Sequence, residues 1–251
     1  MNDESDRYVH DMDWGQGQTQ LSDLTNYRAY QYDLISGHVG QHVLEVGSGD
    51  RGFTHQLATR SKSAPRIVSI EPSESLFTRY ANNFAFPESV QFFNRDIFDV
   101  KPGDYGHLDT IVYIHVLEHI EEDRAALDHC FELLGPGGHI LIEVPALQWL
   151  YSVHDEALGH FRRYNKPTLR SAIDDDKYET IRMWYQDPIG VLGSLYFFKL
   201  GKIRLKSDEG VELVKDKGAL YDKYVIPFEG FVERFITFPF GLSLTAILQR
   251  R

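Results

Sequence analysis

Cysteine is almost absent from this chain, because Cys130 is the only one among 251 residues. A single cysteine excludes an internal disulfide framework and a zinc site built from several cysteines. Cys130 falls within an apolar pattern of helical spacing. We therefore expect a buried packing residue rather than a nucleophile.

Long apolar runs are also missing. No stretch approaches the roughly 18 consecutive apolar residues of a membrane-spanning helix. Residues 1–13 are acidic and contain no apolar core, unlike a secretory signal peptide. These absences predict a soluble, cytoplasmic protein with a reduced thiol.

Basic residues are fewer than acidic ones, with 26 Lys and Arg against 37 Asp and Glu and a net charge of −11. This balance argues against a nucleic-acid partner. Hydrophobic residues make up 42% of the chain, as in ordinary globular proteins. The length allows one large domain or a core with an elaborated cap.

Short apolar segments alternate with helical patterns along most of the chain. This alternation predicts an α/β fold with a doubly wound, mostly parallel sheet. Ligands of such sheets bind at the carboxyl ends of the strands. The expected strands are residues 43–46, 66–71, 90–96, 109–115 and 139–144, and the expected helices are residues 24–35, 53–61, 73–84 and 121–134.

A glycine-rich turn, Gly47-Ser48-Gly49, follows the first expected strand and precedes a helix. This arrangement lets backbone N–H groups approach a ligand closely. Glu45, just before the turn, would repel a pyrophosphate but can pair with a cationic amino group. The turn therefore indicates a nucleoside that carries an amino acid rather than a dinucleotide.

Further polar residues end the next strands. Glu71 lies 22 residues after Gly49, near the spacing of an acid that accepts hydrogen bonds from ribose hydroxyls. Asp96 follows the third strand, where an acid can accept a hydrogen bond from an adenine amine. His115 ends the fourth strand.

With these features the sequence resembles the class I S-adenosylmethionine-dependent methyltransferases over about residues 25–186. The resemblance implies a Rossmann-like seven-stranded sheet with a sixth strand at residues 178–186 and an antiparallel seventh at residues 241–249. The segments that carry the resemblance are Glu45-Val46-Gly47-Ser48-Gly49, Glu71-Pro72, Asp96-Ile97, Val116-Leu117-Glu118-His119-Ile120 and Leu134-Gly135-Pro136-Gly137-Gly138.

The resemblance also implies a division of the chain and a set of cofactor contacts. Residues 1–40 would form a helical lid, 41–186 the S-adenosylmethionine-binding core, 187–240 an apolar cap, and 241–251 the last strand. Tyr27 would either close over the cofactor or pack on the sheet edge. The other expected contacts are Glu45 with the methionine amino group, Gly47, Ser48 and Gly49 in the turn, Glu71 and Pro72 near the ribose, Asp96 and Ile97 near the adenine, and His115 as a shelf.

One position departs from the family. Many members have a third glycine where this chain has Arg51, so we expect either a reshaped turn or an arginine that points to solvent. A narrower likeness, to a subgroup of bacterial methyltransferases, lies in the segment Leu158-Gly159-His160-Phe161-Arg162-Arg163-Tyr164. This segment follows the fifth strand, and its arginines either form an ion-pair latch with Asp155 or contact the substrate.

Methyl transfer to oxygen requires a base, and histidine suits neutral pH. His154 and His160 are the stronger candidates, and His119 is a third that could instead pack at the start of a helix. A divalent metal is a less favoured alternative. His115-x-x-Glu118-His119 is similar to the metal-binding Glu-x-x-Glu-His pattern of ubiquinone-pathway O-methyltransferases and small-RNA 2′-O-methyltransferases, although metal-free members also carry Leu-Glu-His here.

The C-terminal third contains two apolar segments, residues 189–198 and 224–240, and Lys199, Lys202, Arg204 and Lys206 follow the first. These segments either line a pocket for an apolar acceptor, form a homodimer interface, or make a peripheral membrane surface. We expect methyl transfer to a small-molecule or lipid-like acceptor, most simply at oxygen. The alternatives are a non-catalytic cofactor-binding partner protein and a nicotinamide-dependent oxidoreductase.

Overall fold

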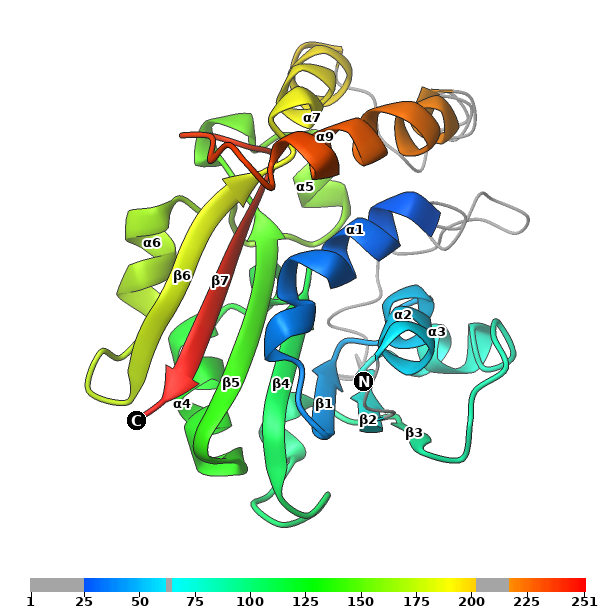
Figure 1. Cartoon of the computed structure of the whole chain (residues 1–251), viewed down its shortest axis with the longest axis vertical. Coiled ribbons are helices and arrows are strands. Elements are labelled where there is room, and N and C mark those ends of the chain that lie inside the picture. The colour runs from blue at the N-terminus through cyan, green and yellow to red at the C-terminus, as the bar shows by residue number, and fades with distance from the viewer. Residues whose placement is uncertain (1–24, 62–64, 202–216) are drawn as a thin grey trace, which may run out of the picture.

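The computed structural model describes residues 25–61, 65–201 and 217–251. A seven-stranded sheet of order β3-β2-β1-β4-β5-β7-β6 forms its centre (Figure 1), and only β7 runs antiparallel to its neighbours. The expected doubly wound, mostly parallel sheet is therefore confirmed. The strands are β1 (His42–Val46), β2 (Arg66–Ile70), β3 (Val90–Phe93), β4 (Leu108–Ile114), β5 (Leu134–Pro145), β6 (Tyr178–Gln186) and β7 (Ser243–Arg250).

Helices cover both faces of the sheet (Figure 1). α1 and α2 pack on one face, and α4 and α6 pack on the other. The helices are α1 (Thr25–Ile35), α2 (Gly52–Arg60), α3 (Glu74–Arg79), α4 (Asp123–Leu133), α5 (Val153–Ala157), α6 (Lys166–Ala172), α7 (Pro188–Gly193), η7 (Ser194–Leu200), η9 (Tyr221–Val225) and α9 (Ile226–Val232), with short turns η3 (Ser36–His38), η4 (Ile97–Asp99), η5 (Leu117–His119) and η6 (Gln148–Leu150).

The continuous apolar run of β4 is explained by burial on both faces. Ile111 and Tyr113 join the core beneath α4, whereas Val112 and Ile114 join the core beneath α1 and α2. Cys130 of α4 lies in the first of these cores, with its Sγ 3.1 Å from the Tyr113 hydroxyl. Burial raises the pKa of the Cys130 thiol to about 12, so the residue is an unreactive, buried packing residue, as expected.

Two elements end earlier than their sequence patterns predict. α3 stops at Arg79 rather than near residue 84, and Asn83 beyond it donates its side-chain amide to the Asp50 carbonyl at 2.7 Å. β3 stops at Phe93 because the Asn94 amide turns back to the Glu71 carbonyl at 2.7 Å. In both cases a side-chain amide bonded to backbone competes with the regular element. β5, in turn, begins at Leu134, so it includes the expected glycine-rich stop.

Arg51 does not point to solvent, so that alternative was wrong. The residue is 5% exposed and takes the left-handed conformation, with φ 64°, that a glycine would adopt without strain. Its guanidinium donates hydrogen bonds to the carbonyls of Ala81 and Phe77 at 2.8 and 3.1 Å and lies 4.0 Å from the centroid of the Phe92 ring. These contacts offset the cost of the backbone conformation and tie the turn after β1 to α3 and β3.

Part of the expected lid and cap lies outside the described residues, namely residues 1–24 and the cations Lys202, Arg204 and Lys206. The described cap elements α7, η7, η9 and α9 lie over the carboxyl ends of the strands (Figure 1). No helix among the described residues is long and apolar enough to cross a bilayer.

Helix α1 is joined to the cap across most of the sequence. The Asp222 carboxylate of η9 accepts hydrogen bonds from the backbone N–H groups of Asn26 and Tyr27, at 3.3 and 2.7 Å. A carboxylate at this position satisfies donors that the first turn of a helix leaves free. The Tyr30 hydroxyl also donates to Glu233, which follows α9. Together α1 and the cap form a roof over the strand ends.

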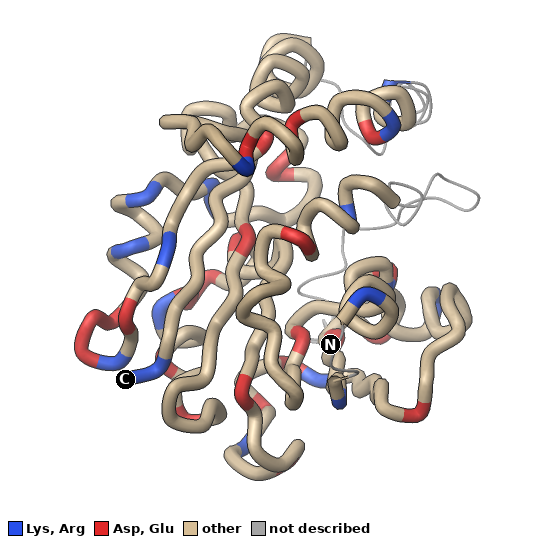
Figure 2. The backbone as a smooth tube through the Cα atoms, viewed as in Figure 1, with Lys and Arg blue, Asp and Glu red and all other residues tan. Residues whose placement is uncertain are grey.

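Several acidic residues lie where this roof meets the strands (Figure 2). Asp187, before α7, accepts a hydrogen bond from the Gly190 N–H at 2.7 Å, and Glu229 of α9 accepts one from the Ile189 N–H at 2.8 Å. The Tyr221 hydroxyl donates to both carboxylates. Burial raises the pKa of Glu229 to about 8, with a further contribution from the charge of Asp187, and burial also raises the pKa of Asp187.

This cluster predicts a loss of stability as the pH rises from about 4.5 to 8. The pKa of Glu229 is raised in the folded state, so the proton it binds stabilises the fold at low pH, and this stability is lost between about pH 4.5 and 8. The replacement Glu229→Gln keeps a neutral side chain at every pH. In the wild type, we expect the free energy of unfolding to decrease by an amount on the order of 3 kcal/mol across this range, and Glu229→Gln should abolish this decrease.

Thermal unfolding followed by circular dichroism at several pH values would measure the effect. The exposed Glu88→Gln is the matched control and should leave the wild-type pH dependence in place. An unchanged pH dependence in Glu229→Gln would show that Glu229 does not retain its proton.

Candidate active site

Two neighbouring cavities open at the carboxyl edge of the sheet, with volumes of about 500 and 110 Å³. Gly47, Gly49, His115 and His119 line both. All thirteen predicted site residues line one or both cavities. The smaller is lined by Gly47, Gly49, Glu71, Pro72, Asp96, Ile97, His115 and His119, and the larger adds Tyr27, Glu45, Ser48, His154 and His160.

Glu71 organises the smaller cavity. Its Oε2 accepts a hydrogen bond from the Gly49 N–H at 2.9 Å, and its Oε1 accepts one from the Ser73 N–H at 3.0 Å. Burial raises the pKa of Glu71, and these two hydrogen bonds oppose the increase. Gly47 has φ 76°, and a Cβ there would lie 2.5 Å from Val116. The turn after β1 is thus held close to the loops after β2 and β4.

Asp96, after β3, is a second carboxylate in the wall of the smaller cavity. Its Oδ1 accepts a hydrogen bond from the Phe98 N–H at 2.9 Å and begins the short turn η4. Ile97 beside it belongs to the buried core. The wall therefore combines an acid held in place by its own loop with an apolar surface, which suits a flat heterocycle with an exocyclic amine.

Glu45 of β1 lies in the wall of the larger cavity and is 2% exposed. Its Oε2 accepts hydrogen bonds from the hydroxyls of Thr54 and Ser69, at 2.5 and 2.6 Å. Burial raises the pKa of Glu45 to about 7, although the two hydroxyls lower it. A carboxylate in this setting gains from a nearby cationic ligand group, because the ligand charge compensates its burial.

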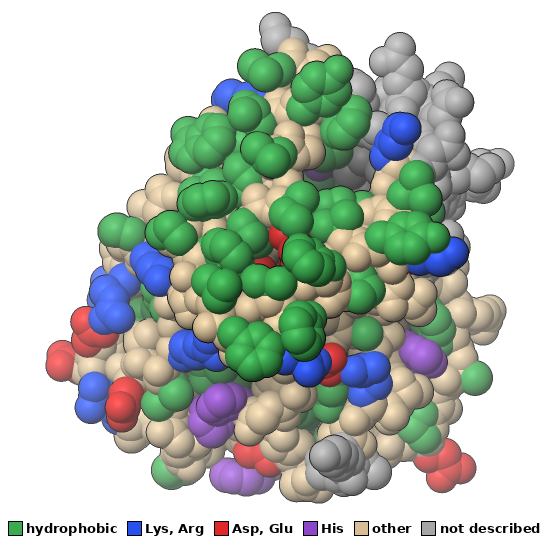
Figure 3. All heavy atoms as spheres, turned by 45° about the horizontal axis from the view of Figure 1, so that its top comes forward, with side chains coloured by type: hydrophobic (Ala, Val, Ile, Leu, Met, Phe, Trp, Pro, Cys, Tyr) green, Lys and Arg blue, Asp and Glu red, His purple; other side chains and the backbone are tan. Residues whose placement is uncertain are grey.

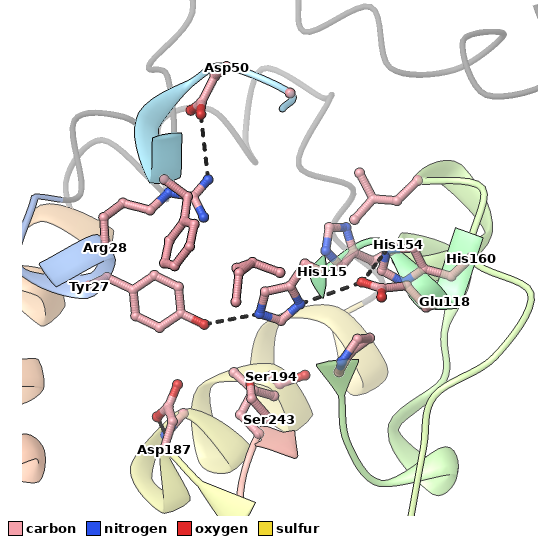
Figure 4. Close-up of a pocket in the computed structure, with 18 of the residues that line it drawn as sticks. Tyr27, Arg28, Asp50, His115, Glu118, His154, His160, Asp187, Ser194 and Ser243 are labelled. Atoms are coloured by element: carbon pink, nitrogen blue, oxygen red, sulfur yellow. Dashed lines mark hydrogen bonds and ion pairs between the residues drawn. The ribbon is translucent and has the colours of Figure 1, made fainter. Parts of the chain in front are cut away.

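His115 stands at the junction of the two cavities (Figure 4) and has φ 54°, a left-handed conformation that is uncommon for a residue other than glycine. Its Nε2 lies 3.1 Å from the Glu143 carboxylate and 3.4 Å from the Tyr27 hydroxyl, and its Nδ1 lies 3.5 Å from Glu118. Burial alone would lower the pKa of His115, but the two carboxylates outweigh it and raise the pKa to about 9. The imidazolium is therefore the form present at neutral pH.

Sequence reasoning missed Glu143 as a site residue. It is fully buried in β5 and accepts a hydrogen bond from the Gln31 side chain of α1 at 2.9 Å, besides its contact with His115. The sequence did contain a signal for this residue, because Glu143 is the single acid in the apolar run of residues 140–144. Arg28 and Asp50 were also missed, and their side chains form an ion pair of 3.6 Å at the same cavity (Figure 4).

The segment after β5 contains an ion-pair latch, one of the two expected roles of its arginines. Asp155 of α5 accepts hydrogen bonds from Arg163 Nε at 2.6 Å and His160 Nδ1 at 3.0 Å. Burial alone would raise the pKa of Asp155, but His160 and Arg163 lower it strongly, so the carboxylate is ionised. Arg162 pairs separately with Asp123 at 2.9 Å. The latch fixes His160 with its Nδ1–H towards Asp155.

Glu118, His119 and His160 converge in the larger cavity, each with a ligand-type atom within 4.8 Å of the others. The Glu118 carboxylate is fully buried, and neither oxygen accepts a hydrogen bond from the described residues. Burial lowers the pKa of His119 to about 4, so its ring is neutral. His115 lies outside this cluster, and His154 stacks on Phe198 with ring centroids 4.4 Å apart.

Comparison of this sequence with known proteins assigns the chain to a protein family. A model described as a methyltransferase domain matches residues 14–188. A ubiquinone biosynthesis O-methyltransferase of Psychrobacter cryohalolentis is 24% identical over 102 residues, which are 41% of this chain and 40% of that protein. A demethylmenaquinone methyltransferase of Clavibacter sepedonicus is 25% identical over 149 residues, 57% of each chain. The matched part of the chain thus spans between 40% and 57% of the length of these two curated relatives.

Solved structures share the fold. An N-methyltransferase, NodS, of Bradyrhizobium japonicum, solved with S-adenosyl-L-homocysteine, superposes with a TM-score of 0.56 at 14% identity, covering 98% of both chains. The family match extends over more than half of this chain and includes the turn, Glu71, Asp96 and the histidine cluster. The protein therefore belongs to the methyltransferase-domain family, and it shares its fold with S-adenosylmethionine-dependent methyltransferases.

Proposed function

We propose that this enzyme methylates an oxygen atom of a small, apolar acceptor that binds between the latch segment and the cap. The observation that carries the proposal is the group formed by Glu118, His119 and His160 at the larger cavity, with His160 fixed by Asp155. An oxygen acceptor needs a positioned proton acceptor, and this group supplies one.

The residues around the smaller cavity fit S-adenosylmethionine. The close approach of Gly47 to Val116 and the anchoring of Gly49 by Glu71 leave a narrow space bounded by Asp96 and Ile97. Glu71 would accept hydrogen bonds from the ribose, Asp96 from the adenine, and Glu45 from the methionine amino group. The bound cofactor supplies an electrophilic methyl group and a sulfide leaving group, and the protein supplies alignment.

His160 is the proposed base. Because its Nδ1–H donates to Asp155, its Nε2 carries the lone pair, and this nitrogen lies 3.9 Å from a Glu118 oxygen. A carboxylate beside Nε2 favours the imidazolium that forms when the acceptor loses its proton. His119 packs edge-on against His160, with ring centroids 4.6 Å apart, and limits its orientation. His154 contributes an aromatic wall with Phe198.

The apolar character of the acceptor rests on the cavity lining and on a relative. Phe197, Phe198 and Ile226 line the larger cavity, and apolar surface of this kind favours apolar ligands. The matched Psychrobacter protein is named as an O-methyltransferase of ubiquinone biosynthesis. Both observations support a phenolic or lipid-like acceptor.

A divalent cation at the same histidine cluster is a second candidate. The buried Glu118 carboxylate favours it, because neither of its oxygens accepts a hydrogen bond from the described residues, although His115 Nδ1 lies 3.5 Å away. Two imidazole nitrogens and one carboxylate suit zinc, manganese or iron better than magnesium. A metal there would bind the acceptor oxygen directly and make a separate base less important.

One prediction of the proposed function concerns the cofactor. Glu71→Ala removes the acceptor that orients the Gly49 N–H, so we expect S-adenosylhomocysteine to bind about 10- to 100-fold more weakly. Isothermal titration calorimetry measures this, with Glu74→Ala, an exposed acid at the start of α3, as the matched control. Equal affinity in both variants would contradict the assignment. Repeating the titration with a chelator would reveal a bound metal if the heat or the affinity changed.

Another prediction of the proposed function concerns His160. His160→Gln removes the base but touches none of the cofactor-binding residues, so kcat should fall about 10²- to 10⁴-fold while S-adenosylhomocysteine affinity is kept. The assay is methyl transfer to phenolic acceptors with apolar tails. His42→Gln, at the opposite edge of the sheet, is the control. Full activity in His160→Gln would exclude this residue as the base.

A further inference from the structure

The cap helices expose their apolar faces and bury their acidic ones. Along η9 and α9, Leu220, Tyr224, Phe228, Phe231 and Phe235 recur at intervals of three and four residues, and all are exposed. The opposite face carries Asp222, Ile226 and Glu229, which are buried. This is the reverse of a helix on a soluble domain, whose apolar stripe faces the core.

The segment of α7 and η7 repeats the pattern. Ile189, Leu192, Tyr196 and Leu200 are exposed at helical spacing, and Gly190, Val191 and Ser194 are buried. With Ile236 and Phe240, the described cap residues expose eleven large apolar side chains. Figure 3 shows hydrophobic side chains gathered on this face. We call these eleven residues the cap surface, and a contiguous surface of this kind marks an interaction site.

The charges of the cap are segregated as well. Among the cap residues that the structure describes, four cations are exposed, namely Lys199, Lys217, Lys223 and Arg234. Asp187, Asp222 and Glu229 are buried, and Glu233 is bonded to Tyr30 and to the Asp187 N–H. Thus no acid is exposed on the described part of the cap, although the whole chain carries a net charge of −11.

We propose that the cap surface docks on an anionic lipid bilayer. Exposed aromatic and aliphatic side chains flanked by cations are the features of interfacial membrane binding. An anionic leaflet attracts each cation near its surface, while the acids that would oppose this attraction are turned into the protein. Docking here is peripheral, because no described helix can span a bilayer.

The charge pattern favours a bilayer over a second copy of the chain. In a two-fold dimer the same patch meets itself, so the exposed cations of one cap would face those of the other without an exposed acid on the described cap to pair with them. A bilayer supplies both an apolar phase and negative charge. It therefore complements the apolar residues and the cations of the cap together.

Docking at the cap surface also explains where an apolar acceptor enters. The same helical segments line the larger cavity from their inner side, through Ser194, Phe197, Tyr221 and Ile226. An acceptor dissolved in the bilayer would then pass between these segments without crossing water. This step rests on the proposed function, whereas docking itself does not require turnover.

Vesicle flotation of the full chain tests the proposal. The probes are vesicles of phosphatidylcholine alone and of equal parts phosphatidylcholine and phosphatidylglycerol. We expect flotation with the anionic vesicles, and Phe228→Glu/Phe235→Glu should weaken it at least about tenfold. Ile181→Glu, an exposed residue of β6, is the matched control and should bind like the wild type. Lys223→Gln/Arg234→Gln should weaken binding at least about fivefold, mainly to anionic vesicles.

Two further measurements separate the outcomes. S-adenosylhomocysteine affinity should be unchanged in all of these variants, which shows that they are folded and keeps failure of docking distinct from failure of the proposed function. Sedimentation equilibrium reports the oligomeric state. Absence of flotation, or equal flotation of Phe228→Glu/Phe235→Glu and Ile181→Glu, would overturn the proposal. A dimer that these two phenylalanine substitutions dissociate, without wild-type flotation, would assign the cap surface to self-association.

Discussion

The polar interior of the site depends on one buried carboxylate, that of Glu143. A charge placed in the middle of an apolar sheet must be compensated by partners from neighbouring elements. Here the partners are the Gln31 amide from α1 and the imidazolium of His115 from the end of β4. His115 in turn reaches Glu118, which belongs to the histidine cluster. Through this chain of contacts, α1, the sheet and the larger cavity are electrostatically connected.

This connection explains the unusual backbone of His115. In the left-handed conformation its ring lies between two carboxylates, one in β5 and one in η5. Strain of this kind persists only where the surrounding contacts determine the conformation. The resulting imidazolium lies between the smaller and the larger cavity, where it offsets part of the negative charge of Glu118 and Glu143.

Much of the fold was predictable from the sequence, because burial on both faces leaves continuous apolar runs and each strand ends in a polar residue. Glu45, Glu71 and Asp96 could be placed at one edge for that reason, and all line a cavity. Their roles in binding remain predictions. Arg51 could not be placed, because its backbone conformation depends on contacts with Phe92 and Ala81, which are distant in the sequence. The orientation of the cap helices was hidden for a similar reason, since apolar spacing alone does not show which face meets the protein.

The position of β7 has a consequence for biosynthesis. β7 follows β6 in the chain but lies between β5 and β6 in the sheet. During synthesis β6 therefore has no partner strand until residues 243–250 have left the ribosome, and β5 keeps an unpaired edge until then. Unpaired strand edges promote association between chains. Completion of the sheet, and of the cavity walls that β5 and β7 contribute, is thus a late folding step that a truncation before β7 would block.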